Sequence, residues 1–251
     1  MQIEGSVALV TGAGRGLGRV FARDLVSRGA ATVYGAARDA AAVTQPGVTP
    51  VMLDITDPDQ VAQAAARCAD VDLLVNNAGV LAASTFIGAP SLDAARLEME
   101  TNYVGTLSMC RAFAPVLAAN GGGALINMLS IVSWFTNPAN GSYSASKAAE
   151  WAMTNGVRIE LARQGTLVVG VHAGFIDTDM AAGIDAPKIS PDMVAQQVFD
   201  AVEAGEIEVL ADERTRRVKE SLPRDHELIY PPLQAAWDGR AAGIAGRTAE
   251  H

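Results

Sequence analysis

A glycine-rich turn near the start of the chain limits the possible folds more than any other stretch. It reads Thr11-Gly12-Ala13-Gly14-Arg15-Gly16-Leu17-Gly18, and it lies between a short apolar run at 7–10 and a helical pattern over about 17–28. A turn of this kind between a strand and a helix lets backbone N–H groups face a phosphate at the helix amino terminus. The spacing is G-x-x-x-G-x-G and not G-x-G-x-x-G, and a turn without a ligand is the alternative interpretation.

Strands and helices alternate along the rest of the chain. Apolar runs at about 31–37, 48–53, 71–75, 124–129, 166–171 and 207–210 predict six further strands, and the intervening helices are expected at about 58–68, 91–118, 141–164 and 191–204. This alternation predicts an α/β, doubly wound, Rossmann-type fold with a central, mostly parallel seven-stranded sheet.

Tyr143 and Lys147 stand four residues apart on the helix expected at 141–164, and Ser130 ends the strand before it. Side chains four apart share one face of a helix, so the ammonium can depress the phenol pKa from about 10 toward neutrality. Such a phenol gives or takes a proton at a carbonyl or alcohol oxygen. An ordinary solvated pair is the alternative.

The second strand ends in Arg38-Asp39, where a dinucleotide fold contacts the adenosine ribose. A carboxylate there accepts from the 2′-hydroxyl of NAD, whereas a guanidinium binds the 2′-phosphate of NADP. Arg15 in the glycine turn is placed to reach the same phosphate, so the two Arg favour NADP, and NAD through Asp39 stays open. Asp54 ends the third strand, where a carboxylate can accept from an adenine amino group.

Composition argues against several other classes of protein. The net charge of −9 disfavours nucleic acid and anionic membranes as partners. The start of the chain shows no signal-peptide pattern, and long apolar runs are lacking, so we expect no membrane association and a cytoplasmic location. Cys68 and Cys110 form no C-x-x-C motif and are expected to be free thiols. The three His, at 172, 226 and 251, are scattered and predict no metal site.

In combination these motifs resemble those of the classical short-chain dehydrogenase/reductase family. The similar residues are Thr11-Gly12-x-x-x-Gly16-x-Gly18, Asp54, Asn76-Asn77-Ala78-Gly79, Asn102, Ser130, Tyr143-x-x-x-Lys147 and the loop from Gly174 to Thr178, in family order. The resemblance implies one domain over 1–251, with a cofactor half at about 1–120 and a catalytic and substrate half at about 121–251. It further implies binding of NAD or NADP, interconversion of alcohols and carbonyls, and a homotetramer or homodimer.

The resemblance also implies a role for each motif residue. Tyr143 is the general acid or base, Lys147 lowers its pKa and binds the nicotinamide ribose, and Ser130 donates to the substrate oxygen. Asn102 holds a water that links Lys147 to solvent. The residues expected to bind the cofactor, with Arg38 added from its position, are Gly12, Arg15, Gly16, Leu17, Gly18, Arg38, Asp54, Ile55, Asn77, Ala78, Gly79, Tyr143, Lys147, Gly174, Ile176 and Thr178.

The chain departs from the family in having Ala173 where Pro usually precedes Gly174, which leaves the rigidity of that loop open. His172, just before it, is expected to be structural or semi-exposed, with a place in the substrate pocket as the alternative. The helix expected at 141–164 is apolar nearly all round, which a subunit interface would explain.

The candidate substrate pocket is mostly apolar, and plain core packing is its alternative interpretation. Its residues are Leu81, Ile131, Trp134, Phe135, Ala173, Phe175 and Met180. These features favour an NADP(H)-dependent carbonyl reductase or ketoreductase acting on a bulky hydrophobic ketone or aldehyde. The alternatives are an NAD-dependent alcohol or hydroxysteroid dehydrogenase, an acyl-carrier-protein ketoreductase, and a non-catalytic dinucleotide-sensing protein.

Overall fold

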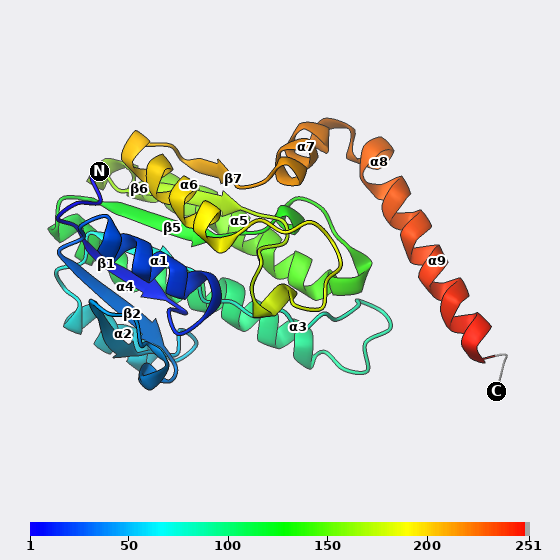
Figure 1. The fold of residues 1–251 in the computed structure, drawn as a ribbon, viewed down its shortest axis with the longest axis horizontal. Helices are drawn as coiled ribbons and strands as arrows, with labels where there is room; N and C mark the ends of the chain where they lie inside the picture. Colours follow the sequence, from blue (N-terminus) through cyan, green and yellow to red (C-terminus); the bar gives the residue numbers. More distant parts are fainter. Residues whose placement is uncertain (249–251) are drawn as a thin grey trace.

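The computed structural model describes residues 1–248, and its side chains through residue 239. Its centre is a seven-stranded sheet in the order β3-β2-β1-β4-β5-β6-β7 (Figure 1). The strands are β1 Val7–Thr11, β2 Thr32–Ala37, β3 Val48–Met52, β4 Leu73–Asn76, β5 Ala124–Met128, β6 Leu167–His172 and β7 Glu208–Leu210. Every pairing between these strands is parallel, so the predicted doubly wound fold is confirmed and the sheet is wholly rather than mostly parallel.

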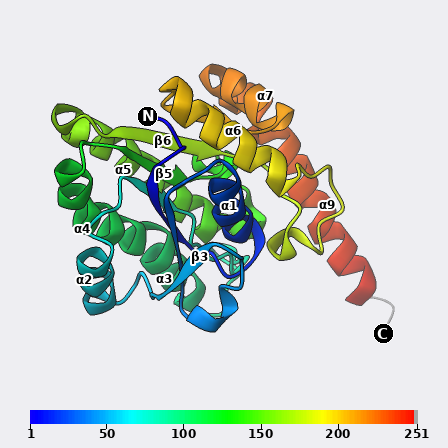
Figure 2. The ribbon, with the colours of Figure 1, turned by 60° about the vertical axis from the view of Figure 1, so that its left-hand side comes forward.

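Helices cover both faces of the sheet (Figure 2). They are α1 Gly16–Ser27, α2 Pro58–Arg67, α3 Asp93–Glu98, α4 Thr106–Ala119, α5 Gly141–Leu161, α6 Pro191–Ala204, α7 Glu213–Ser221, α8 Asp225–Leu228 and α9 Tyr230–Thr248. Helices α1 and α6 pack together on one face, and α2, α4 and α5 lie on the other. Asp57 caps α2, accepting from the N–H groups of Asp59 and Gln60.

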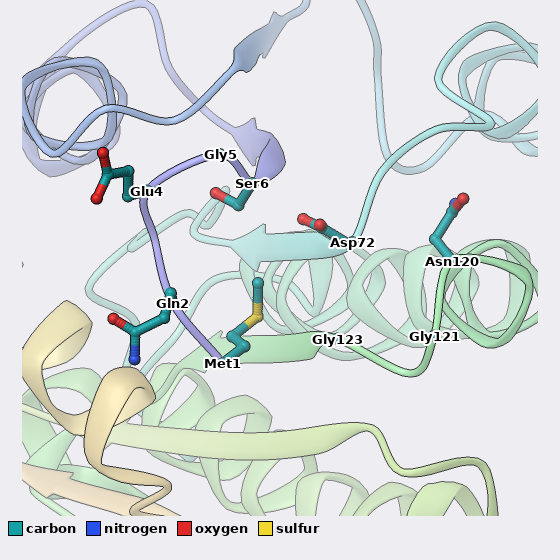
Figure 3. Close-up of a pocket in the computed structure, with 9 residues that line it drawn as sticks. All are labelled: Met1, Gln2, Glu4, Gly5, Ser6, Asp72, Asn120, Gly121 and Gly123. Carbon is teal, nitrogen blue, oxygen red and sulfur yellow. The ribbon is translucent and has the colours of Figure 1, made fainter.

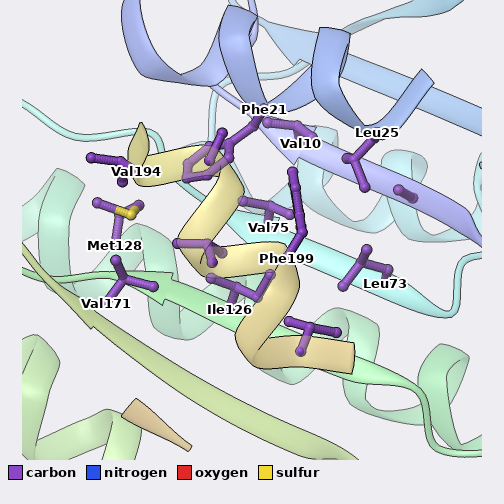
Figure 4. Packing of buried hydrophobic residues seen from close by; sticks show 14 of the residues in the cluster. Val10, Phe21, Leu25, Leu73, Val75, Ile126, Met128, Val171, Val194 and Phe199 are labelled. Atoms are coloured by element: carbon purple, nitrogen blue, oxygen red, sulfur yellow. The ribbon is translucent and has the colours of Figure 1, made fainter. Parts of the chain in front are cut away.

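The two cores follow from the alternation of side chains along each strand. In β1, Val10 faces the cluster under α1 and α6, whereas Leu9 faces the cluster under α2 and α4. Phe21 of α1 and Phe199 of α6 meet edge to face at 5.5 Å and close the first core, which Figure 4 shows. Because both faces of the sheet are buried, its polar side chains are confined largely to the strand ends, where the candidate site lies.

The single helix expected at 91–118 is divided in the structure. Helix α3 passes into a π-helical segment, Met99–Gly105, before α4 begins. The segment contains Asn102, whose side chain is fully buried and exchanges hydrogen bonds with the backbone of Val80. The apolar periodicity of the sequence does not distinguish a π segment from an α-helix, and such segments are common at functional sites.

Beyond β7 the chain forms α7 and α8, and α9 then extends away from the body (Figures 1 and 2). Within the described residues, no helix combines the length and apolarity needed to cross a membrane. Residues 249–251, which belong to the domain predicted from the sequence and include His251, lie outside the described part of the chain.

Candidate active site

Tyr143, Lys147 and Ser130 gather at the carboxyl edge of the sheet. Ser130 follows β5 and is buried, and Tyr143 and Lys147 occupy successive turns at the start of α5. Lys147 is 5% exposed, and its Nζ donates to the carbonyl of Met128 over 2.7 Å. The last residue of β5 therefore fixes the ammonium beside the phenol, and the structure brings together the three residues predicted for proton transfer.

Burial raises the pKa of the Tyr143 phenol above its ordinary value. The Lys147 ammonium and the Ser130 hydroxyl act in the opposite direction, while the carboxylate of Glu150 adds to the rise. Lys147 therefore acts on this pKa in the predicted direction, but in the chain by itself the net shift is upward and not toward neutrality, because loss of hydration outweighs the attraction of the ammonium.

Gly79 lies directly against the proton-transfer residues. A side-chain carbon at this position would be 3.2 Å from Asn102 Oδ1 and 3.8 Å from Lys147 Nζ. The Asn102 amide also donates to the hydroxyl of Ser146 over 2.9 Å, which ties the π segment to α5. The loop after β4 thus passes close to Lys147 without a side chain between them.

The glycine turn is fixed by Thr11 and Asn77. The Thr11 hydroxyl accepts from the N–H groups of Asn77 and Ala78 over 2.9 and 3.0 Å, and the Asn77 amide donates to the Thr11 carbonyl over 2.9 Å. A side-chain carbon at Gly18 would lie only 2.2 Å from the carbonyl oxygen of Gly12. These contacts hold the loops after β1 and β4 together.

The amino terminus of α1 suits a dinucleotide phosphate. Arg15 stands at its cap position and makes no side-chain cap, so it leaves the first N–H groups of the helix open. Gly12 and Gly16 have φ of +68° and +51°, conformations that a side chain would strain. A side-chain carbon at Gly16 would lie 3.7 Å from Thr178 Cβ, so the loop after β6 borders the same space. This cradle fits the pyrophosphate of NAD(P).

The residues predicted for the adenosine end lie at neighbouring strand ends. Arg15 and Arg38 are exposed, and Asp39 accepts from the N–H of Ala41 over 3.0 Å. The Asp54 carboxylate accepts from both the N–H and the hydroxyl of Thr56. Ile55 is buried against Gly105 of the π segment, where a side-chain carbon would be 2.8 Å from Ile55 Cγ1.

The loop after β6 is held from two sides despite Ala173 in place of Pro. The Ala173 carbonyl accepts from the N–H of Ile131 over 2.9 Å, and the Gly174 N–H donates to Asp212 Oδ2 over 2.7 Å. Farther along the loop, Ile176 pairs with Ile189 in an isolated parallel bridge. These contacts supply the restraint that the missing ring would have given.

His172 is a structural residue in the folded chain. It is 1% exposed, its ring stacks on Trp134 with centroids 3.9 Å apart, and burial lowers its pKa to about 4. Its Nδ1 lies 3.1 Å from the carbonyl oxygen of Ser130, which can only accept, so this nitrogen carries the ring proton. Lys219 of α7 lies 4.9 Å from the Trp134 ring centroid and pairs with Glu208. The stack connects α7 to the backbone of Ser130.

The apolar residues predicted for the substrate pocket divide by burial. Ile131, Phe135 and Ala173 are buried in the packed clusters. Leu81, Trp134 and Phe175 are half-buried, and Met180 is 52% exposed. The second group lies at the surface where a substrate can reach it, and its role stays a prediction.

Two buried carboxylates at the site were not singled out from the sequence. Glu98 accepts from the N–H of Ala82 over 2.7 Å and from the hydroxyl of Ser142, joining the loop after β4 to the start of α5. Glu150 forms an ion pair with Lys147. Its position three residues after Lys147, on the same helix face, is the signal that would have found it.

A shallow pocket on the opposite edge of the sheet lies away from these residues (Figure 3). It is formed at the amino ends of β1, β4 and β5. Its lining residues are Met1, Gln2, Glu4, Gly5, Ser6, Asp72, Asn120, Gly121 and Gly123. Because Tyr143 and Ser130 stand at the carboxyl edge, this pocket takes no part in the candidate site.

Comparison with known proteins gives one consistent family. The model of the short chain dehydrogenase family matches residues 6–188. A short chain dehydrogenase from Burkholderia cenocepacia J2315, solved in complex with NADP, is 44% identical with a TM-score of 0.89, covering 93% of this chain and 99% of that one. The sorbitol dehydrogenase of Cereibacter sphaeroides is 34% identical over 74% of this chain and 76% of its own length. The 3-oxoacyl-(acyl-carrier-protein) reductase FabG of Vibrio harveyi is 33% identical over 74% of this chain and 79% of its own.

The chain therefore belongs to the short-chain dehydrogenase family. It is an NAD(P)-dependent oxidoreductase acting on CH–OH and C=O groups.

Proposed function

We propose that the protein is an NADP(H)-dependent carbonyl reductase that converts a ketone or aldehyde into an alcohol. The observation that carries this proposal is the grouping of Tyr143, Ser130 and Lys147 beside Gly79, at the edge of the sheet that also bears the phosphate-binding turn. A phenol, a hydroxyl and an ammonium in one place suit the transfer of a proton to a carbonyl oxygen.

The side chains act together on the substrate oxygen, which lies between the hydroxyls of Ser130 and Tyr143. Ser130 donates a hydrogen bond that stabilises the charge growing on this oxygen, and Tyr143 gives it a proton. Lys147 stabilises the phenolate that results and contacts the nicotinamide ribose, and Asn102 fixes the π segment behind it. Bound NADPH supplies the hydride to the carbonyl carbon.

Preference for NADP rests on Arg15 and Arg38. Both side chains are exposed beside the phosphate-binding turn, where a 2′-phosphate would accept charge-assisted hydrogen bonds. The NADP complex of the Burkholderia cenocepacia relative supports this choice. NAD remains the alternative through Asp39, but one of its carboxylate oxygens already accepts from the N–H of Ala41.

The substrate we propose is bulky and hydrophobic, because the accessible side chains near Ser130 include Trp134 and Phe175. We divide the domain into a cofactor half at about 1–120 and a catalytic and substrate half at about 121–251. The full set of Tyr143, Lys147, Ser130 and Asn102 disfavours a dinucleotide sensor without activity, since such a protein needs none of them.

We also propose that the enzyme is a homotetramer or homodimer of the cytoplasm. Ile159 on α5 is 77% exposed, which supports contact between copies along this helix. The free thiols of Cys68 and Cys110, both buried, suit a reducing compartment. Light scattering of wild type and Ile159→Asp tests the assembly, and the variant should shift toward monomer.

The deciding experiment is titration of wild type with NADPH and NADH, followed by turnover on a panel of aliphatic and aryl ketones. We expect NADPH to bind at least roughly tenfold more tightly, about 1.4 kcal/mol. Arg38→Asp should remove this preference, whereas Arg163→Asp, an equal charge change at a distant exposed position, should keep it. Tighter binding of NADH by wild type would move the ribose contact to Asp39 and favour alcohol oxidation.

Tyr143→Phe tests the chemical step separately. Loss of the phenolic proton should lower kcat by roughly 10² to 10⁴ or more while cofactor binding persists. Tyr34→Phe is the matched control, because its hydroxyl bonds to Asp70, which precedes β4 and lies away from the carboxyl edge of the sheet. A Tyr143→Phe enzyme that still reduces the best ketone at the wild-type rate would contradict the proposed mechanism.

A further inference from the structure

Helix α5 carries a buried ion pair directly behind the candidate active site. Glu150 is 1% exposed and Lys147 is 5% exposed, and Lys147 Nζ lies 2.6 Å from Glu150 Oε2. With the 2.7 Å hydrogen bond to the Met128 carbonyl, this contact uses two of the three N–H groups of the ammonium. The third is left for the phenol or for a ligand.

A chain of polar side chains continues inward from this pair. The Thr154 hydroxyl donates to the backbone carbonyl of Glu150 over 2.7 Å and accepts from the Asn127 amide over 2.9 Å. Asn127 in turn accepts from Asn76 of β4 over 2.9 Å. These hydrogen bonds from α5, β5 and β4 fix the backbone at Glu150, and the contact with Lys147 orients its carboxylate.

The ionisable groups facing the pair come from three helices. Tyr143 shares α5 with it, Cys110 projects from α4, and Glu98 at the end of α3 acts on Tyr143. Burial raises the pKa of Cys110 to about 12, so this thiol stays neutral. Glu150 is consequently the nearest negative charge to Lys147 in this set.

Stability alone gives no reason for this carboxylate. Burying two charges costs hydration, and replacing a buried ion pair by apolar residues is often neutral or stabilising. Burial raises the pKa of Glu150 to about 7 even though Lys147 lowers it. What the carboxylate does achieve is electrostatic, since it raises the pKa of both Lys147 and Tyr143.

We propose that Glu150 is a positioning residue for proton transfer, which fixes the Lys147 ammonium against the Met128 carbonyl and balances its charge beside Tyr143. By offsetting the ammonium, Glu150 favours the protonated form of the phenol, in the same direction as burial. A protonated phenol is the proton donor that carbonyl reduction needs, whereas alcohol oxidation needs the phenolate. The proposal rests on the proposed function for its direction, but the charge balance is a property of the chain itself.

The test therefore begins without cofactor or substrate. The tyrosinate absorbance of wild type and of Glu150→Gln is titrated with pH, and the same titration of each protein with Tyr143→Phe isolates the signal of Tyr143. Gln keeps the shape and an acceptor oxygen but removes the charge, so the Tyr143 midpoint should fall by about one pH unit. Glu160→Gln, on the exposed side of α5, should leave it in place.

Steady-state kinetics give the second readout. In Glu150→Gln the pH limb for alcohol oxidation should move downward with the Tyr143 midpoint, and KM for the cofactor should rise because Lys147 is less well fixed. A merely structural role of Glu150 would lower the melting temperature without moving the Tyr143 midpoint or the pH limb of alcohol oxidation. An unchanged or raised Tyr143 midpoint in folded Glu150→Gln overturns the proposal.

Should Glu150→Gln fail to fold, Glu150→Asp carries the test. It retains the charge but draws it back by one methylene, so a smaller fall of the Tyr143 midpoint is expected, and no fall again overturns the proposal. Absence of ketone turnover in wild type would instead contradict the proposed function, and the absorbance titration would still decide the role of Glu150.

Discussion

The backbone N–H of Gly174 donates to the carboxylate of Asp212 over 2.7 Å and so joins the loop after β6 to the start of α7. The same carboxylate accepts from the N–H and the hydroxyl of Thr215, both over 2.8 Å, and thereby caps α7. The resemblance to the family predicts Pro before this glycine. Here Ala173 takes its place, and an external anchor restrains the loop on the nicotinamide side of the proposed cofactor site.

Replacing Asp212 by Ala should therefore lower both the stability of the fold and the catalytic efficiency. Loss of the cap and of the partner for the Gly174 N–H should lower the free energy of unfolding by about 2–4 kcal/mol. Displacement of the loop should lower kcat/KM by roughly tenfold or more. Urea unfolding and steady-state kinetics measure the two effects. Asp59→Asn, an exposed change on α2, serves as the control. An Asp212→Ala enzyme with wild-type stability and activity would refute the role of Asp212 in restraining the loop.

Two glycines on helices should respond to alanine in opposite ways. At Gly18 the new carbon would meet the Gly12 carbonyl oxygen at 2.2 Å, so Gly18→Ala should destabilise by about 1–3 kcal/mol and weaken NADP(H) binding. At Gly156 in α5 the new carbon meets nothing within 4 Å, so Gly156→Ala should stabilise by about 0.5–1 kcal/mol. Urea unfolding curves compare both with wild type, and equal effects at the two positions would disprove the close approach at Gly18.

The titration of His172 should favour unfolding as the pH falls from 7 to 5, whereas Glu150, whose pKa is raised, contributes with the opposite sign in the same range. Burial lowers the pKa of His172 to about 4, against 6.5 for an exposed His. In this range the unfolded chain takes up the proton and the folded chain does not, so acid favours unfolding. The contribution is about 2 kcal/mol between these two pH values.

The measurement is urea unfolding at pH 5 and pH 7 for wild type and His172→Phe. The variant loses the bond to Ser130 and should be less stable than wild type at pH 7, but this difference in stability should shrink by about 2 kcal/mol at pH 5. His226→Asn, on the exposed surface of α8, should keep the wild-type dependence. If the free energy of unfolding of His172→Phe has the same pH dependence as wild type, His172 does not make the predicted contribution.

The parts of the site that were predictable are those fixed by short stretches of sequence. The glycine turn lies between one strand and one helix, and Tyr143 and Lys147 are related by a single helical turn. Their positions follow from local geometry and need no knowledge of distant contacts. The ends of the parallel strands then bring Asp54, Asn77 and Ser130 to one edge of the sheet.

The parts that were missed depend on burial and on long-range contact. Glu150 reads as an ordinary surface charge until the fold shows that its side of α5 faces inward, and Asp212 meets Gly174 across 38 positions. The net direction of the Tyr143 pKa was also mispredicted, because the cost of burial is not visible in the spacing of two residues. The polar inward face of α5, which carries Lys147, Glu150 and Thr154, was likewise not predicted from its apolar composition.

The stack of Lys219, Trp134 and His172 has a consequence for how the enzyme is made. Translation delivers the chain from its amino end, so Ser130, Tyr143 and Lys147 leave the ribosome well before Lys219 does. The stack and the Asp212 anchor form only when α7 arrives. A chain that ends between Lys147 and α7 thus holds every predicted catalytic side chain but lacks the contacts behind them, so we expect it to be less active than the full chain.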